Sequence, residues 1–216
     1  MSAFKQRVTL AITGASGLQY AIRLLEVLVK QDTQVLMMIS KAAQVVGATE
    51  TNLQFGGSSS VQEAYFTQLF GARQDQIKVF GKEQWMAPVA SGSGAPSAMV
   101  VCPCSTGCLS AIATGASNNL IERAADVVLK ERKQLILVPR EAPYSEIHLE
   151  NMLKLTRMGA VILPASPGFY NQPKSIEDLI DFVVARILSQ LGFEQTLLPT
   201  WGSHLLNTKE GEQDNG

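Results

Sequence analysis

The regular alternation of short apolar runs with amphipathic segments limits most strongly how this chain can fold. The apolar runs have the length of buried strands, whereas the segments between them repeat apolar residues at a helical period. This alternation predicts a doubly wound, mostly parallel sheet with right-handed crossovers. We therefore expect an α/β fold in three αβα layers. The expected strands cover residues 8–13, 35–39, 77–80, 98–102, 135–138 and 161–163, and the expected helices cover residues 20–29, 41–48, 61–70, 106–114, 120–130, 147–158 and 175–191.

The length of 216 residues suits one domain, which we place at residues 1–206, before a polar tail at 207–216 that we expect to be disordered. A net charge of −1 disfavours nucleic-acid binding, which requires a basic face. No apolar run reaches membrane-spanning length and the N-terminus lacks a separate apolar signal segment, so we expect a cytoplasmic protein without a membrane partner. Only 17% of the residues are charged, which suggests that some surface is buried between subunits.

The three cysteines lie in one short segment, VVCPCSTGC, as Cys102, Cys104 and Cys108. Their odd number argues against a disulfide framework, and their spacing lacks the C-x-x-C pattern of a zinc site. The two histidines, His148 and His204, are distant in sequence. We expect no metal, and we interpret the cysteines as small packing residues at a strand-to-helix turn.

Small and charged residues follow several of the expected strands. Residues 13–17 (TGASG) and residues 103–107 (PCSTG) are glycine-containing turns before helices, and Ser40 ends a third strand. Helix N-termini at such turns attract anions, but tight turns also need glycine for structural reasons and Ser40 fits an ordinary N-cap. The first turn has G-x-x-G spacing, so a dinucleotide fingerprint is poorly supported. Arg140 and Glu141 follow a fourth strand, between two prolines that stiffen the corner. They are either phosphate-binding residues or surface residues of a tight turn.

Two further groups of residues admit both a functional and an ordinary interpretation. Arg123 and Lys130 are seven residues apart on one expected helix, so they share a face that is either solvated or a binding surface. Residues 165–173 hold two prolines, a glycine and two aromatic residues directly after a strand. This loop either covers an apolar ligand, with the Tyr170 hydroxyl binding a phosphate, or is packed as an ordinary loop.

Several segments together resemble one known family. They are residues 13–17 (TGASG), 100–106 (VVCPCST), 115–143 (GASNNLIERAADVVLKERKQLILVPREAP), 147–173 (IHLENMLKLTRMGAVILPASPGFYNQP) and the helix that contains residues 184–186. On these segments, and from Val8 to Trp201 as a whole, the chain resembles the UbiX-type flavin prenyltransferases (the UbiX/PAD family of the flavoprotein superfamily). Asn118 stands where many members have Asp, and residues 54–84 match only loosely, so no site is carried over from them.

The resemblance implies a Rossmann-like (flavodoxin-like) fold and a metal-independent enzyme. Such an enzyme transfers a dimethylallyl group from dimethylallyl monophosphate to N5 and C6 of reduced FMN. Its product, prenylated FMN, is the cofactor of a UbiD-type decarboxylase, in ubiquinone biosynthesis or in aromatic acid degradation. The resemblance also implies a homododecamer with active sites at subunit junctions.

The same resemblance implies roles for individual residues, and the chemistry fits them. A cationic clamp would stabilise the negative charge that develops on the leaving phosphate, and an aromatic wall would stabilise an allylic cation. The proton lost at C6 would pass to Glu50, to Glu141 or to the released phosphate, with Ser16 as a relay near N5. The FMN-binding residues would be Gly14, Ala15, Ser16, Ser40, Ser105, Thr106, Gly107, Cys108 and Arg140. The donor-binding residues would be Tyr170, Arg186, Arg123 and Lys130, with Trp201 as the aromatic wall and Lys130 also catalytic.

Two alternatives share the expected fold and flavin site. One is an FMN-dependent oxidative decarboxylase of the peptidyl-cysteine type, a family that relies on a histidine near the flavin. The other is a non-catalytic flavin-binding subunit. The chain length of the donor and the choice between a monophosphate and a diphosphate depend on pocket depth and on how many cations converge.

Overall fold

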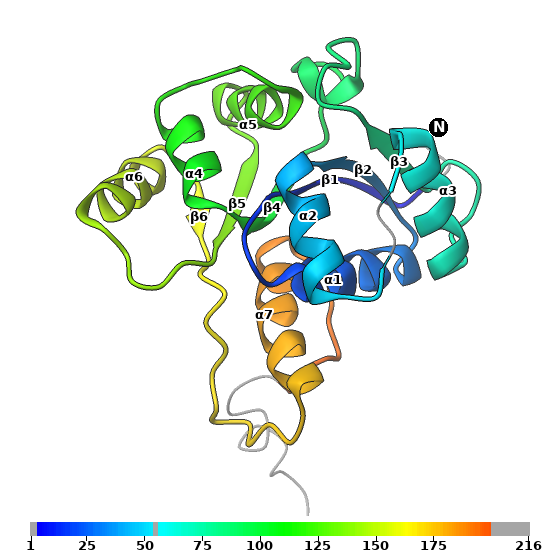
Figure 1. Ribbon diagram of the computed structural model, residues 1–216, viewed down its shortest axis with the longest axis vertical. Coiled ribbons are helices and arrows are strands. Elements are labelled where there is room, and N and C mark those ends of the chain that lie inside the picture. Colours follow the sequence, from blue (N-terminus) through cyan, green and yellow to red (C-terminus); the bar gives the residue numbers. More distant parts are fainter. Residues whose placement is uncertain (1–3, 54–55, 200–216) are drawn as a thin grey trace, which may run out of the picture.

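A single parallel sheet organises the chain. The structure, a computed structural model, describes residues 4–53 and 56–199 (Figure 1). Its strands are β1 (Gln6–Ile12), β2 (Thr33–Ile39), β3 (Ile77–Phe80), β4 (Ala98–Cys104), β5 (Gln134–Pro139) and β6 (Val161–Ile162). Its helices are α1 (Leu18–Lys30), α2 (Lys41–Glu50), α3 (Ser59–Phe70), the short 3₁₀ helix η1 (Pro88–Ala90), α4 (Thr106–Ala113), α5 (Leu120–Lys130), α6 (Glu146–Arg157) and α7 (Ile176–Gln190).

The strands are hydrogen-bonded in the order β3-β2-β1-β4-β5-β6, and each of the five pairings is parallel. This is the order of the doubly wound Rossmann arrangement, so the predicted α/β class and parallel sheet are confirmed. The chain reverses its direction of strand addition between β1 and β4. In open α/β sheets a ligand crevice lies at this point, outside the carboxyl ends of the strands.

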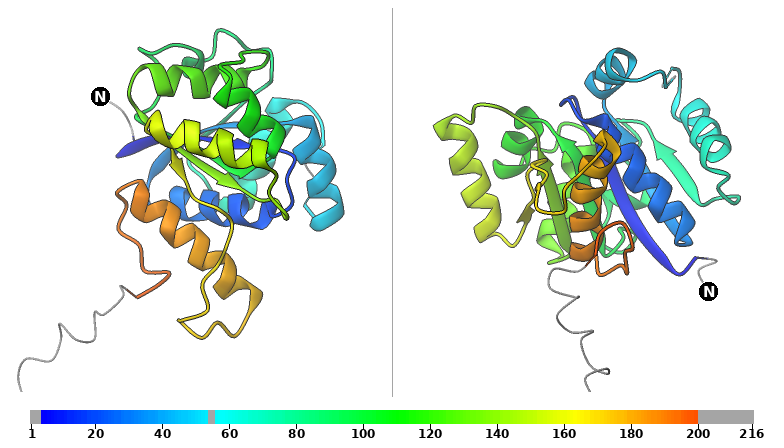
Figure 2. Two further views of the ribbon diagram at one scale, coloured as in Figure 1. Left: turned by 90° about the vertical axis from the view of Figure 1, so that its left-hand side faces the viewer. Right: turned by 90° about the horizontal axis from the view of Figure 1, so that it is seen from below.

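Two hydrophobic cores, one on each face of the sheet, account for the three layers. Leu24 of α1 and Val184 of α7 are fully buried in one core. Leu109 of α4, Ala124 of α5 and Leu155 of α6 are fully buried in the other core. Figure 2 shows the same division, with α1 and α7 below the sheet and α4 and α5 above it in its left-hand view.

Burial on both faces explains why the strands read as continuous apolar runs. In β1, Leu10 and Ile12 enter one core and Ala11 enters the other. β4 is buried throughout and extends through Pro103 to Cys104, two residues beyond the expected end. Pro103 has no N–H for the ladder, and the register with β5 shifts between Val101 and Cys104 to accommodate it.

Among residues 4–53 and 56–199, no helix is both long and apolar enough to cross a membrane. The expected domain boundary at residue 206 and the expected disordered tail lie outside the described residues, as do Trp201 and His204. The cytoplasmic location stays a prediction.

Candidate functional site

A cavity of about 580 Å³ lies at the carboxyl edge of the sheet. The loop after β1 contributes Thr13 and Gly14 to its wall, and Ser40 follows β2. The turn after β4 contributes Ser105, with Gly107 and Cys108 in the first turn of α4. Three of the four strand ends that the sequence singles out therefore meet in one cavity, at the switch point where the Rossmann arrangement predicts a ligand.

Several helices point their N-termini at this cavity. Ser40 caps α2 and accepts a hydrogen bond from the Ala43 amide at 3.0 Å, so the ordinary N-cap interpretation of Ser40 is also correct. The N-caps Ser105 of α4 and Asn119 of α5, and Ser59 in the first turn of α3, line the same cavity. Converging N–H groups and helix dipoles make the cavity attractive to an anion such as a phosphate.

Two lysines that the sequence analysis does not single out also line the cavity. Lys41 is the first residue of α2, and Lys82 lies just after β3. Gln62 of α3, which is almost fully buried, completes this side of the wall. The only sequence signal for them is their closeness to strand or helix ends, and residues 54–84 match the resembling family only loosely.

Two glycines shape the cavity because they lack a side chain. A Cβ at Gly14 would lie 2.3 Å from Cβ of Ala42, so only glycine lets the β1 loop approach α2 this closely. A Cβ at Gly107 would meet no atom within 4 Å, so it would project into the open cavity. The volume, the small residues and the anion-attracting helix ends together fit the phosphate end of FMN.

Thr13 joins the two loops at the switch point, a role that the sequence analysis misses. Its Oγ1 donates a hydrogen bond to the Pro103 carbonyl at 2.8 Å and accepts one from the Ser105 amide at 2.7 Å. The Thr13 amide also donates to the Pro103 carbonyl at 3.2 Å. Thr13 is only 4% exposed, so these bonds hold the N-terminus of α4 in place against β1.

Ser16, Glu50 and Arg140 form a second cluster beside the β1–α1 turn. Gly17, in the N-cap position of α1 with φ of 102°, has no side chain to cap the helix. The Glu50 carboxylate supplies this cap by accepting a hydrogen bond from the Gly17 amide at 2.9 Å, and Arg140 Nε donates to the Ser16 carbonyl at 3.3 Å. The structure thus brings together three candidate residues from the loop after β1, the C-terminal end of α2 and the corner after β5.

The protonation of Glu50 follows from this setting. Partial burial acts to raise its pKa, but hydrogen bonds from the Ser16 side chain and from the Gly17 and Leu18 amides act against it, with the nearby Arg140 charge. The net effect is a pKa below the usual value, so Glu50 is ionised at neutral pH.

Glu141 lies half-buried beside Tyr144, whose pKa is raised by burial and then by the Glu141 charge, with Arg140 acting in the opposite direction. The His148 ring packs edge-on against Tyr144, with the ring centroids 6.5 Å apart. His148 Nδ1 also accepts a hydrogen bond from the Ser145 amide at 3.2 Å in the capping box of α6. This histidine is therefore engaged in helix capping and does not line the 580 Å³ cavity.

Tyr170 and Arg186 lie near each other on the α7 side of the molecule, outside that cavity. The Tyr170 ring packs edge-on against Phe182 at 5.5 Å between centroids. Phe182 and Arg186 line a separate hollow of about 250 Å³ along β6 and α7. Both candidate donor-binding residues are exposed.

Arg123 and Lys130 lie on α5 and do not line the cavity, although Arg123 directly follows Glu122, which does. Arg123 donates from Nε to the Ala90 carbonyl at 3.2 Å and pairs with Asp126 at 3.1 Å, whereas Lys130 pairs with Glu131. α5 has 11 residues, so Lys130 lies roughly 15 Å from the end that lines the cavity. A role for Lys130 therefore needs a site on a second copy of the chain.

The cysteines divide into two groups. Cys102 and Cys104 are fully buried packing residues, as expected, and burial raises the pKa of the Cys102 thiol. Cys108 is half-buried and lines the cavity. In the described parts of the chain, no three His, Cys, Asp or Glu side chains lie close enough together to hold a metal ion.

Comparisons with known proteins agree with this geometry. The flavoprotein family model matches residues 2–188. The flavin prenyltransferase UbiX of Pseudomonas aeruginosa is 63% identical over 205 residues, which cover 95% of this chain and 98% of that protein. The crystal structure of AnUbiX (PadA1) with FMN and dimethylallyl pyrophosphate is 39% identical, with a TM-score of 0.78 over 91% of this chain and 98% of that one.

A dodecameric FMN-dependent UbiX-like decarboxylase from Escherichia coli O157:H7 is 36% identical, with a TM-score of 0.80 over 90% of this chain and 98% of that one. Relatives at these levels of identity and coverage share the fold and the family of this chain. The chain therefore belongs to the flavoprotein family and, within it, to the UbiX-type flavin prenyltransferases.

Proposed function

We propose that this enzyme transfers the dimethylallyl group of dimethylallyl monophosphate to N5 and C6 of reduced FMN and supplies the prenylated FMN to a UbiD-type decarboxylase. The observation that carries the proposal is the 580 Å³ cavity on which the N-termini of four helices converge. The AnUbiX complex with FMN and dimethylallyl pyrophosphate supports the pairing of a flavin with an allylic phosphate.

Residues of the cavity would hold FMN by its phosphate. Ser40 and Ser105 present the N-termini of α2 and α4, and Lys41 and Lys82 add positive charge on the rim. Gly107 leaves room for the ligand to approach the α4 backbone. When bound, reduced FMN supplies the nucleophilic N5 and C6 atoms.

The cluster of Ser16, Glu50 and Arg140 would serve the proton transfers. Arg140 holds the Ser16 backbone and places a fixed positive charge beside Glu50. Ionised Glu50 is available to accept the proton that is lost at C6, with Glu141 and the released phosphate as the other acceptors. Ser16, which hydrogen-bonds Glu50, is suited to pass protons toward the β1–α1 turn.

The donor would lie between this cluster and the α7 side. Tyr170 and Arg186 would bind its phosphate, together with Arg123 and Lys130 of a second copy of the chain. Cations around the leaving phosphate stabilise the charge that develops as the allylic C–O bond breaks. Trp201, which lies outside the described residues, is proposed from the resemblance alone as the aromatic residue that stabilises positive charge on the allylic carbons.

This arrangement requires self-association, and we propose a homo-oligomer of the same kind as the dodecameric relative. Large apolar side chains that the described chain leaves exposed support it, since their burial between copies would be favourable. Met86 is 97% exposed, Ile176 is 71% exposed and Phe169 is 69% exposed.

The test is an anaerobic incubation of the purified protein with reduced FMN and dimethylallyl monophosphate, followed by mass spectrometry of the extracted flavin. We expect a gain of one C5H8 unit. Isopentyl monophosphate is the matched control, because its saturated chain forms no allylic cation and should leave the flavin unchanged. Unmodified FMN on a folded protein that binds the flavin would overturn the transferase proposal and favour a non-catalytic flavin-binding subunit.

A further inference from the structure

The 580 Å³ cavity is larger than the part of FMN that the proposed function places in it. A phosphate with its ribityl chain displaces about nine water molecules, or roughly 270 Å³ at the volume of liquid water. About half of the cavity is therefore left for a further group.

The order of the strands shows on which side of the phosphate this space lies. The proposed function places the reacting flavin ring at the Glu50 cluster, whose Arg140 follows β5. The phosphate-binding residues Ser40 and Ser105 follow β2 and β4. The wall beyond them is formed at the end of β3, on the side of the sheet away from β5. Neighbouring strands are about 4.8 Å apart, so the cavity continues roughly 10 Å from the end of β1 to the end of β3.

The β3 end of the cavity combines an aromatic face with two cations. Phe80, the last residue of β3, is half-buried and lines the cavity. The carbonyl of Lys82 accepts a hydrogen bond from the Leu120 amide at 2.8 Å, which holds this segment against the start of α5. The Lys82 side chain has one ion pair among the described residues, with exposed Glu83 at 3.3 Å. Lys41 on the same wall has no carboxylate partner within the described ranges. An aromatic face beside cations suits a base and its phosphate.

One carboxylate, Glu122, also lines the cavity. It accepts hydrogen bonds from the Asn118 amide at 2.8 Å and from the Asn119 side chain at 2.7 Å. Its charge is therefore directed at the N-terminus of α5. Two lysines and four helix N-termini outweigh this single negative charge, so the cavity as a whole favours an anionic ligand.

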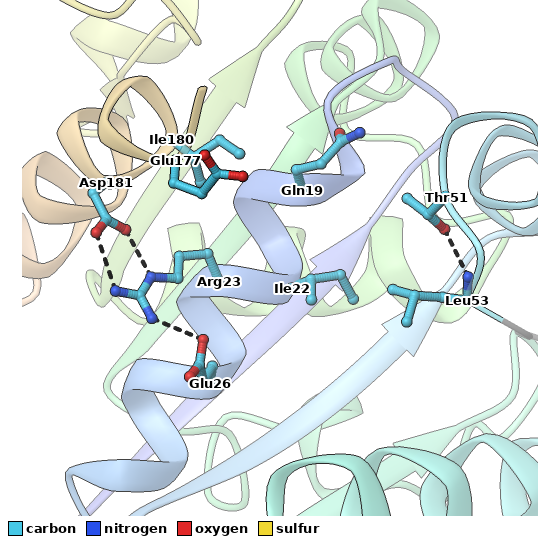
Figure 3. Close-up of a pocket in the computed structure, with 9 residues that line it drawn as sticks. All are labelled: Gln19, Ile22, Arg23, Glu26, Thr51, Leu53, Glu177, Ile180 and Asp181. Atoms are coloured by element: carbon cyan, nitrogen blue, oxygen red, sulfur yellow. Dashed lines mark hydrogen bonds and ion pairs between the residues drawn. The ribbon is translucent and has the colours of Figure 1, made fainter. Parts of the chain in front are cut away.

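A second hollow, of about 400 Å³, lacks these features. It lies between α1, α7 and the segment after α2 (Figure 3). Arg23 is the only cation among the described residues that line it, and no aromatic residue does. Asp181 binds Arg23 at 2.7 and 3.0 Å and Glu26 binds it at 2.8 Å, as Figure 3 shows. This hollow offers a phosphate no unpaired cation, whereas the cavity at the carboxyl edge does.

We propose that the β3 end of the cavity is a subsite for an adenosine phosphate group, continuous with the phosphate site of FMN. FAD carries such a group on the phosphate of FMN, in the direction in which the cavity continues. Its base would lie against Phe80, and its second phosphate would meet Lys41, Lys82 and the N-termini of α2 and α3. The β1–α1 turn lacks the dinucleotide fingerprint, but this phosphate would not bind there. Free AMP bound beside FMN would use the same groups.

The inference rests on the flavin orientation of the proposed function, and its test measures binding without the donor. Equilibrium dialysis of the full chain against oxidised FMN or FAD gives the two dissociation constants for the wild type, Phe80→Leu and Lys82→Gln. Phe80→Leu keeps an apolar side chain but removes the aromatic face. Phe70→Leu is the matched control, because Phe70 is also half-buried and stacks on Phe66 at the far end of α3, outside the cavity. Circular dichroism checks that each variant is folded.

We expect the wild type to bind FAD at least as tightly as FMN. Phe80→Leu should lower the affinity for FAD about tenfold more than the affinity for FMN, the effect of losing one stacked base. Lys82→Gln should also weaken FAD binding more than FMN binding, whereas Phe70→Leu should change neither.

Dialysis against AMP in the presence of saturating FMN distinguishes the two sources of the group. AMP binding that Phe80→Leu weakens would assign the subsite to free nucleotides as well, and FAD binding without AMP binding would assign it to the dinucleotide. If the protein binds FMN but neither FAD nor AMP, or if Phe80→Leu binds both as tightly as Phe70→Leu does, the subsite is overturned and the proposed function stands. A protein that binds none of the three would overturn the proposed function as well.

Discussion

Thr13→Val tests whether one buried hydroxyl positions the phosphate-binding turn of α4. Valine has nearly the shape of threonine but lacks the hydroxyl, so the substitution removes the two hydrogen bonds of the Thr13 side chain. These are the 2.8 Å bond to the Pro103 carbonyl and the 2.7 Å bond from the Ser105 amide.

The expected cost follows from these two bonds. Each net hydrogen bond contributes about 1 kcal/mol, and a buried N–H left without a partner costs about 1–3 kcal/mol. We therefore expect the Val variant to lose about 2–3 kcal/mol of unfolding free energy. If the freed α4 N-terminus gives up one hydrogen bond to a phosphate, FMN binding weakens by roughly tenfold to a hundredfold.

Thr13→Ser is the matched control, because it keeps the hydroxyl and loses only a methyl group. Urea denaturation of the apoprotein at one fixed concentration measures stability, and quenching of flavin fluorescence measures FMN affinity. We expect the Ser variant to stay within about 1 kcal/mol of the wild type in stability, with nearly unchanged affinity. The positioning role is refuted if the Val and Ser variants bind FMN equally well, whatever their stabilities.

Three further predictions address the site. The Arg140→Ala and Lys130→Ala variants should each fold and bind FMN measurably. Each should lose about a hundred- to a thousandfold in the rate of prenyl transfer, measured by the mass-spectrometric assay. Normal turnover in either variant would show that the substituted residue takes no part in the chemistry. Gly107→Ala places a Cβ in the open cavity, so FMN affinity should fall about tenfold or more. Thermal stability should stay equal or rise, because alanine favours the helix. Unchanged affinity would mean that the ligand does not approach α4 at this position. Partial burial acts to raise the pKa of Glu50, but the hydrogen bonds from Ser16 and Gly17 lower it below the usual value. Ionised Glu50 therefore stabilises the folded protein at pH values above the unfolded-state pKa of about 4.3. This stability is lost as the pH falls through the folded-state pKa. Glu50→Gln should therefore flatten the acid limb of a melting-temperature profile, and an acid limb as steep as in the wild type would count against the cap.

The candidate site was predictable from the sequence to the extent that it consists of strand ends. Ser40 and Ser105 each follow a strand directly, and Gly107 lies two residues after Ser105. The structure places all three in one cavity because parallel strands end at one edge. Lys41 and Lys82 line the same cavity without any distinguishing pattern. Lys130, in contrast, is a residue that the sequence does single out. Its position on α5 was predictable, but its distance from the cavity of its own chain was not.

The sequence by itself determined the strands, the helices and the parallel class of the sheet, because hydrophobic period and helix caps act over a few neighbouring residues. Only the tertiary structure decided which distant residues meet. Thr13 and Pro103 are 90 positions apart, Gly17 and Glu50 are 33 apart, and Arg140 and Ser16 are 124 apart. The Gly17–Glu50 contact depends on how α2 packs beside the β1–α1 turn. The other two contacts depend on the chain crossing from β3 past β2 and β1 to place β4 beside β1. This choice of side is made by the packing of the whole sheet rather than by any local pattern.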